Sequence, residues 1–490
     1  MTQLRCHLIF HVPWPVNGAS SLSLDGVVDG LVAWVDLFER FEHALASIHV
    51  DGRVLEYLES EHRALADRLA ALVSSGRLEA VGGGFYSPLL AMLMWRDAVG
   101  QLEMSAGFWD RRTGIRPQGA WLFEQVWMPR MAEILSDAGV QWTLLDEASF
   151  RRAGLGDSVD GWYVTEHVAR PVALLPIDAK TQADFGVQSA SDALANLRMR
   201  LDSDATDLTL TWAGSVLLNE PQQRQWWEDF LQLSVQEQSW LSLAQPRQTV
   251  ETTAPKSRVY LPGGMSTAAA AHCRGLGHSE LSVAEPSWQR YLAFYGEADR
   301  LHKRMIEVSR RFAAVERVMR NGGWRTMSQL TRPRRMLYRA QSGLAYGHGS
   351  GAGIHLARVR SQTYRDLIEA ELACDALVAS ANQGQRMEVG LRDVFADLST
   401  AVVVRSSSLR VVIHPKRAGG VWGLEHLASR RAFHDVLTRR REPYHDSKDQ
   451  GVDDHERAVF VDRVIDRHTR SAHWMMSADD RADFARQEYR

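Results

Sequence analysis

Residues 119–129 read GAWLFEQVWMP, in which the carboxylate of Glu124 stands among large apolar side chains. The run GAWLF predicts a buried strand, and Glu124 lies one residue past it. Similar apolar runs alternate with amphipathic helical patterns over residues 1–265, which is typical of βα units with parallel strands. Because functional residues of an α/β barrel sit at the carboxyl ends of its strands, Glu124 occupies a site position. The predicted strands are 8–12, 78–83, 119–123, 142–146, 172–177 and 208–212.

Three regions of the chain differ in pattern. Residues 1–265 predict the α/β barrel domain, and residues 266–385 predict a helical segment packed on it. Residues 386–490 carry short alternating apolar runs separated by turn residues, which predict a partial or shortened β-sandwich domain. Within the first region, the helical patterns 58–76 and 128–139 each end near a glycine, as helices prefer.

Composition limits the classes of function. The chain has 490 residues, of which 45% are hydrophobic and 24% charged, so it is globular with a substantial core. Its 57 basic and 60 acidic side chains form no long basic stretch, so we expect no nucleic acid partner. The apolar N-terminal run is short and broken by Pro13, which argues against a signal peptide or a membrane span. The three cysteines are widely spaced, so we expect no disulfide and a cytoplasmic protein. The histidines have no metal-binding spacing, so we expect no metal or other cofactor.

Six segments resemble glycoside hydrolase family fifty-seven, in the same order and at similar spacing. The likeness is closest to the 4-α-glucanotransferases and α-amylases of that family. It implies a (β/α)7-type barrel followed by a helical segment and a C-terminal β-sandwich, acting on α-1,4-glucans by a retaining mechanism. The segments are 75–91, 119–129, 138–150, 174–180, 301–305 and 339–356.

The resemblance supplies one carboxylate of the reaction and not the other. A retaining mechanism needs a nucleophile and an acid/base whose carboxyl groups lie about 5 Å apart. The family's nucleophile is the glutamate of a W-L-x-E-x-x-W-x-P motif, which Glu124 matches. Its acid/base is an aspartate of a D-D-G-E-type motif, and the corresponding stretch 208–220 has no acid there. The residues at those positions are Trp212, Ala213, Gly214 and Ser215.

Other motifs of the family are also altered. Of its first motif, H-x-H-Q-P, only His11 remains, and it is out of register. In its second motif, Ser87 replaces a glutamate. A later motif lacks an Asn-Asp pair and a Trp but keeps Tyr346 and His348; the replacing residues are Gly343, Leu344 and Gly347.

Glu124 takes the nucleophile position, and other residues are expected to contact substrate. The alternative role for Glu124 is structural, in which it binds strand-end backbone or an arginine. Aromatic rings suit the apolar faces of sugars, but at strand ends they are as often core. Asp184 and Glu220 are the nearest candidates for a replacement acid. The predicted substrate-binding residues are Trp121, Trp127, Phe85, Asp146, Asp178 and His348.

Three functional hypotheses remain open from the sequence. The leading hypothesis is a catalytically impaired homologue, a pseudoenzyme, that binds an α-1,4-glucan or maltooligosaccharide, or a protein partner. The alternative is an active 4-α-glucanotransferase or α-amylase with Glu124 as nucleophile and a displaced acid/base carboxylate. The third is a carbohydrate reaction on a good leaving group, which needs only one carboxylate.

Overall fold

The protein divides along its chain into two compact units. The first comprises Met1–Ala271 and Glu285–Trp288, and the second comprises His272–Ala284 and Gln289–Arg490. The structure, a computed structural model, describes residues 3–15, 23–156, 159–213, 220–274, 287–320, 327–349, 352–379, 387–417, 419–440, 452–453 and 456–460.

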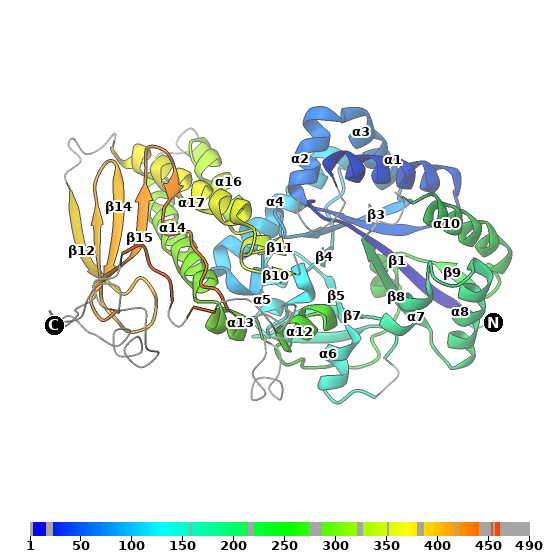
Figure 1. The fold of residues 1–490 in the computed structure, drawn as a ribbon. Helices are drawn as coiled ribbons and strands as arrows, with labels where there is room; N and C mark the ends of the chain where they lie inside the picture. Colours follow the sequence, from blue (N-terminus) through cyan, green and yellow to red (C-terminus); the bar gives the residue numbers. More distant parts are fainter. Residues whose placement is uncertain are drawn as a thin grey trace. The chain divides into compact units, whose positions relative to one another are not determined.

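The first unit is a closed barrel of seven parallel strands, which confirms the predicted barrel (Figure 1). The strands follow one another in the order β1-β2-β3-β4-β5-β7-β8, and β8 pairs with β1 to close the ring. Their bounds are β1 (Leu4–Val12), β2 (Ala46–Val50), β3 (Leu78–Gly83), β4 (Gly119–Trp121), β5 (Trp142–Asp146), β7 (Arg170–Ile177) and β8 (Asp207–Ala213).

Two barrel strands each share one edge between two neighbours. On β1, strand β9 (Leu241–Leu243) pairs with residues 4–6, and β2 pairs with residues 9–12. The other edge of β1 is occupied by β8 over residues 5–11. On β7, strand β6 (Tyr163–His167) runs antiparallel along the first part, and β8 pairs with only the last residue, Ile177. Strands β2, β6 and β9 were not among the strands that the sequence predicted.

Helices connect the barrel strands, and local residues fix where they begin and end. Ser23 caps α1 by accepting a hydrogen bond from the Gly26 backbone N–H at 3.0 Å, and Gly114 ends α4 with a φ of 74°. The single helix expected over residues 58–76 is wrong, because the backbone leaves helical geometry at His62 and α2 and α3 are separate. The helices of this unit are α1 (Leu24–Arg40), α2 (Gly52–Glu61), α3 (Arg63–Ser74), α4 (Trp95–Thr113), α5 (Met131–Asp137), α6 (Glu147–Arg152), α7 (Ala179–Asp184), α8 (Ala190–Asp202), α10 (Pro221–Ser234), α11 (Pro246–Thr252) and α12 (Thr267–Arg274).

An aromatic cluster joins β1 to the helices packed on it. The ring of Phe10 lies 5.4 Å from Trp34 and 5.8 Å from Phe38, both on α1, and 5.2 Å from Trp227 on α10. These rings meet edge to face, the geometry that aromatic quadrupoles favour. All four side chains are buried, so the cluster anchors this side of the barrel.

A carboxyl group is buried inside the barrel near the amino ends of the strands. Glu79 on β3 accepts hydrogen bonds from Trp142 Nε1 at 3.1 Å and from the Arg247 backbone N–H at 3.2 Å, and Ser47 Oγ donates to it at 3.5 Å. Burial raises the pKa of Glu79 to about 7, although these hydrogen bonds oppose the rise.

This raised pKa predicts that Glu79 destabilises the fold as pH rises. Its pKa is about 7 in the folded state against an ordinary value of 4.5, so the penalty is absent below about pH 4.5 and complete above pH 7. Between pH 4 and pH 8, the unfolding free energy of Glu79→Gln is expected to gain about 3 kcal/mol on that of the parent protein. Equilibrium urea unfolding measures this difference.

Glu103→Gln is the matched control, because Glu103 is an exposed glutamate of the same unit. The control is expected to follow the parent protein at every pH. If Glu79→Gln also runs parallel to the parent, the carboxyl group is not neutralised by burial.

The described part of the second unit consists of helices, one five-stranded antiparallel sheet and one short strand pair, where the sequence predicted a helical segment and the antiparallel strands of a shortened β-sandwich (Figure 1). The helices are α13 (Trp288–Phe294), α14 (Gly296–Arg320), α16 (Thr331–Ala340) and α17 (Ala357–Ala379). No helix in the described part of the chain is both long and apolar enough to cross a membrane. The sheet has the order β12 (Glu388–Arg392), β13 (Ala401–Arg405), β14 (Leu409–His414), β15 (Gly420–His426) and β16 (Arg431–Ala432), and a separate short pair is formed by β10 (His348–Gly349) and β11 (Ala352–Gly353).

A buried network of charges fastens the helices of this unit to its sheet. Arg304 on α14 donates to Glu371 on α17 at 2.7 Å and to Glu425 on β15 at 2.8 Å. Arg410 on β14 pairs with Glu307 on α14 at 2.5 Å and with Glu425 at 3.3 Å. Burying such charges is tolerated because each of them has a close partner of opposite sign.

Candidate functional site

Three aromatic side chains stack at the carboxyl end of the barrel. The imidazole of His11, near the end of β1, lies parallel to the indole of Trp121 with ring centroids 4.7 Å apart. The ring of His11 also lies beside that of His49 on β2, with ring centroids 4.9 Å apart and the two Nδ1 atoms 2.8 Å apart. Burial lowers the pKa of His11 to about 4 and that of His49 well below its usual value. Both rings are therefore neutral near pH 7, and one Nδ1–H donates to the other Nδ1.

A glycine makes room for this stack. Gly83 ends β3 with a φ of +152°, and a Cβ at this position would lie 2.8 Å from the Trp121 carbonyl oxygen and 2.9 Å from His49 Nε2. Backbone on one side and a buried ring on the other leave no room for a side chain. The position of His49 beside Trp121 therefore depends on glycine at residue 83.

Glu124 stands in a turn with unusual backbone geometry. The turn η2 (Phe123–Gln125) follows β4, and both Glu124 and Gln125 are left-handed, with φ of 52° and 50°. Non-glycine residues hold this conformation where surrounding contacts enforce it. Here the contacts come from residues 264–266: the Ser266 backbone N–H donates to the Glu124 carbonyl at 2.9 Å, and Trp127 and Gly264 exchange backbone hydrogen bonds of 2.8 and 3.0 Å.

The Glu124 carboxylate follows β4 and has no cationic partner in the described part of the chain. Its side chain is exposed to solvent, yet protein atoms crowd around it, and the loss of hydration raises the pKa of its carboxyl group. Ser266 Oγ donates to Oε2 at 3.4 Å and opposes that rise. No arginine, lysine or histidine in the described ranges pairs with this carboxylate.

Aspartates at the ends of β2, β5 and β7 begin the helices that follow these strands. Each accepts a backbone N–H of the first turn through Oδ1: Asp51 from Arg53 at 2.8 Å, Asp146 from Ala148 at 2.9 Å, and Asp178 from Thr181 at 2.8 Å. They are the N-caps of α2, α6 and α7. Their position at the mouth thus has a structural cause.

The second oxygens of these aspartates are also occupied. Asp51 Oδ2 accepts from the Ser87 hydroxyl at 2.6 Å, at the position where the resemblance leads one to expect a glutamate. Asp146 Oδ2 accepts from the Thr267 backbone N–H at 2.8 Å. Asp178 is buried, and its Oδ2 pairs with Arg200 at 2.6 Å. The sequence left open whether Asp178 binds backbone or sugar, and here it binds backbone and an arginine.

The residues that replace the family's acid/base motif begin at the end of β8. Strand register places Ala213 directly opposite His11, and Trp212 packs against Trp227 with centroids 4.9 Å apart. Gly214 and Ser215 lie outside the described residues. The two candidates for a displaced acid have ordinary surroundings. Asp184 accepts hydrogen bonds from Gln188 and Asn196. Glu220 is an exposed residue just before α10.

A carboxyl group that the sequence analysis did not single out lies beside the site. Glu147 follows β5 directly and is buried. Burial raises its pKa, the negative charges of Asp178 and Asp146 add to the rise, and its ion pair with Arg151 at 2.7 Å opposes it. His49 and Ser266 were missed as well. The signal for His49 was a strand ASIHV ending before Asp51, but nothing local in the sequence joins Ser266 to Glu124.

The predicted aromatic contacts differ in their exposure. Trp127 and Phe85 have only 1% and 6% of their surface exposed, so neither ring has a free face for a sugar. Trp121 is half-buried and keeps open surface at the mouth. His348 belongs to the second unit, where its backbone begins β10, and its side chain lies outside the described residues. Within the described part of the chain, no three His, Cys, Asp or Glu side chains gather as metal ligands.

Three family models match successive parts of the chain. "Glycosyl hydrolase family 57" matches residues 33–262, which span most of the barrel. "Alpha-amylase/4-alpha-glucanotransferase, middle domain" matches residues 287–374, and the C-terminal domain of the same name matches residues 393–452.

The similarity to two named proteins extends over most of this chain. It is 25% identical over 445 residues to an alpha-amylase of Pyrococcus horikoshii, with 85% of this chain and 66% of the relative covered. It is 24% identical over 442 residues to a 4-alpha-glucanotransferase of Thermococcus litoralis, with 84% and 62% covered. The chain thus spans less than two thirds of the length of these relatives. The crystal structure of the Thermococcus litoralis 4-alpha-glucanotransferase has the same fold, with a TM-score of 0.82 at 22% identity over 100% of this chain and 78% of that one.

The hydrogen bond from Ser266 predicts the titration of Glu124. Ser266→Ala removes the donor that opposes burial, so the pKa of the Glu124 carboxyl group is expected to rise further. NMR of protein with ¹³C-labelled glutamate side chains follows the titration, and Glu124→Gln identifies the signal. Ser203→Ala, an exposed serine remote in sequence, is the control. An unchanged titration in Ser266→Ala would show that the hydroxyl does not act on Glu124.

Proposed function

Since the chain belongs to glycosyl hydrolase family 57, we propose that its barrel mouth binds α-1,4-glucan chains while its retaining chemistry is impaired. The observation that carries this proposal is the state of the carboxylates. Glu124 is open to solvent and pairs with no cation among the residues that the structure describes, whereas Asp51, Asp146 and Asp178 each have both oxygens engaged. The retaining reaction needs a second carboxyl group about 5 Å from the nucleophile.

The end of β8 supports the same proposal. The resemblance expects the acid/base there, and the residue opposite His11 is Ala213, whose methyl group holds no proton to donate. Loss of a positioned acid/base lowers a rate roughly 100- to 10,000-fold. It does not by itself remove the contacts that hold a sugar in place.

Binding has its own support at the mouth. The open surface of Trp121 offers an apolar face, and the carboxyl oxygens of Glu124 are acceptors for hydrogen bonds from sugar hydroxyls. Trp121 ends β4 and Glu124 lies three residues later in the turn η2, and the stack with His11 holds the indole in place. This combination of a ring face and a nearby acceptor suits a pyranose.

One observation favours the alternative of an active enzyme. Glu147 is a buried carboxyl group of raised pKa at the end of β5, which is the property expected of a general acid. Its ion pair with Arg151 favours the ionised form and argues against that role. In an active glucanotransferase or amylase, Glu147 would be the displaced acid and Glu124 the nucleophile.

Long incubation with maltooligosaccharides of defined length separates the two functions. We expect the parent protein, Glu124→Gln and Glu147→Gln to leave the chain lengths unchanged by chromatography. Calorimetry with maltohexaose is expected to give similar affinities for these three proteins, because glutamine at position 124 keeps a carbonyl oxygen that accepts a hydrogen bond. Trp121→Ala is expected to bind about tenfold more weakly, because an aromatic stacking contact is lost.

Restoring an acid provides the positive control. Among Ala213→Asp, Gly214→Asp and Ser215→Asp, at least one variant is expected to redistribute chain lengths, and adding Glu124→Gln to that variant to abolish the activity. Turnover by the parent protein that disappears in both Glu124→Gln and Glu147→Gln would establish the active alternative. Absence of both turnover and sugar affinity would leave the partner-protein role, to be sought by copurification.

A further inference from the structure

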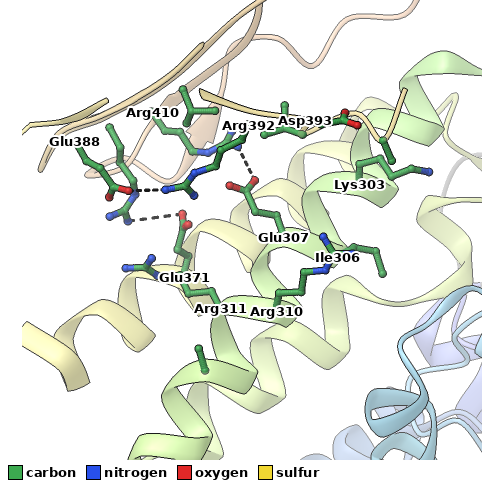
Figure 2. Close-up of a pocket in the computed structure, with 15 residues that line it drawn as sticks. Lys303, Ile306, Glu307, Arg310, Arg311, Glu371, Glu388, Arg392, Asp393 and Arg410 are labelled. Carbon is green, nitrogen blue, oxygen red and sulfur yellow. Dashed lines mark hydrogen bonds and ion pairs between the residues drawn. The ribbon is translucent and has the colours of Figure 1, made fainter. Parts of the chain in front are cut away.

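A cavity lies in the second unit, between α14 and strands β12 to β14 (Figure 2). We call it the α14 groove. Its volume is about 480 Å³, which is within the roughly 300–1,000 Å³ of small-molecule sites. Four acidic side chains contribute to its walls, together with six cationic ones: Lys303, Arg310, Arg311, Arg392, Arg405 and Arg410.

Most of these cations are already paired. Arg410 binds Glu307 at 2.5 Å, Arg392 binds Glu388 at 2.5 Å, and Lys303 binds Asp299 at 2.6 Å. Figure 2 shows Glu307 pointing from α14 toward the sheet, where Arg410 meets it. The Arg410–Glu307 pair joins β14 to α14 across the groove, whereas the other two pairs lie within β12 and within α14.

Arg311 and Arg405 share an acidic partner, Asp375, that is not among the lining residues. Arg311 Nε donates to Asp375 at 2.6 Å, and Arg405 binds the other oxygen of the same carboxylate. Asp375 does not line the groove, so its negative charge is set back while the guanidinium groups face the cavity. The lining itself therefore carries two more positive than negative side chains.

Arg310 is the exception among the six. It is exposed on α14, and within the described ranges no hydrogen bond or ion pair engages its guanidinium. The adjacent Arg311 adds a second positive charge on the same helix. Asp393, a lining residue on the loop after β12, accepts the backbone N–H groups of Asp397 and Leu398.

The rest of the lining is apolar. Ile306 on α14, Val403 on β13 and Val394 on the loop between the strands present aliphatic surface to the groove. No aromatic ring is among the lining residues, so the groove lacks the stacking surface that suits an uncharged sugar. A ligand for it combines one anionic group with a compact organic body.

We propose that the α14 groove binds a small phosphate monoester, with the phosphate on Arg310 and the organic body against the aliphatic wall. Guanidinium groups match phosphate oxygens through paired hydrogen bonds, and an arginine free of carboxylates binds an anion without breaking an existing ion pair. The four acidic side chains of the lining disfavour a long polyanion, because they would repel its further charges.

Calorimetry of the full chain with glycerol 3-phosphate tests the proposal. This probe carries no sugar ring, so the barrel mouth does not compete for it. At constant ionic strength, the parent protein is expected to bind it with measurable heat, and Arg310→Ala to bind it about tenfold more weakly or worse, since a charged hydrogen-bonding group is lost. Glycerol and inorganic phosphate are titrated beside it.

Arg317→Ala is the matched control. Arg317 is an exposed arginine two turns further along α14, is not among the groove residues, and has no described partner. It is expected to bind the ester like the parent protein. Equal binding by Arg310→Ala, no binding by the parent protein at millimolar ester, or equal affinity for glycerol would each overturn the proposal. Inorganic phosphate that binds as tightly as the ester would overturn the role of the aliphatic wall.

Discussion

The barrel depends on β1, whose two edges are both hydrogen-bonded to neighbouring strands. Strand β8 occupies one edge, and β9 and β2 divide the other. This register sets His11 opposite His49 on one side and Ala213 on the other. Because side chains alternate across a strand, a slip of one residue would turn His11 away from Trp121 and dismantle the stack. The chemistry available at the mouth therefore follows from how β1 closes the ring.

Three aspartates at the barrel mouth have a role in the fold that Glu124 does not share. Asp51, Asp146 and Asp178 each satisfy a backbone N–H at the start of a helix, a contribution of about 1 kcal/mol apiece. Their presence at strand ends needs no catalytic explanation. Glu124 caps nothing, and its left-handed backbone costs about 1–3 kcal/mol. Folding alone does not account for a glutamate in that turn, which makes Glu124 the residue most closely tied to ligand binding.

The sequence predicted the barrel because its strands are nearly continuous apolar runs. The runs at 78–83 and 142–146 coincide with β3 and β5, whereas the strand predicted over 119–123 ends at Trp121, so Glu124 lies in the turn three residues after β4 and not directly past the strand. The strand β2 was missed because ASIHV is short and carries a histidine. Contacts across the chain were not predictable: Ser266 reaches Glu124 from 142 residues away. The burial of individual rings was not predictable either. The spacing of the residues did not show that the ring of Trp127 is enclosed while that of Trp121 is partly exposed.

The two proposed binding sites share a physical cause. In the second unit, burying Arg304 beside Glu371 and Glu425 requires close partners for every charge, so the acids there are committed to the fold. Arg310 remains outside that network, as Glu124 remains outside the helix caps of the barrel. A ligand gains most from such groups, because binding them breaks no internal pair and loses only solvation. The side chain that each unit leaves without an internal partner therefore determines which ligand group binds there. Glu124 suits hydroxyl donors at the barrel mouth, and Arg310 suits an anion in the α14 groove.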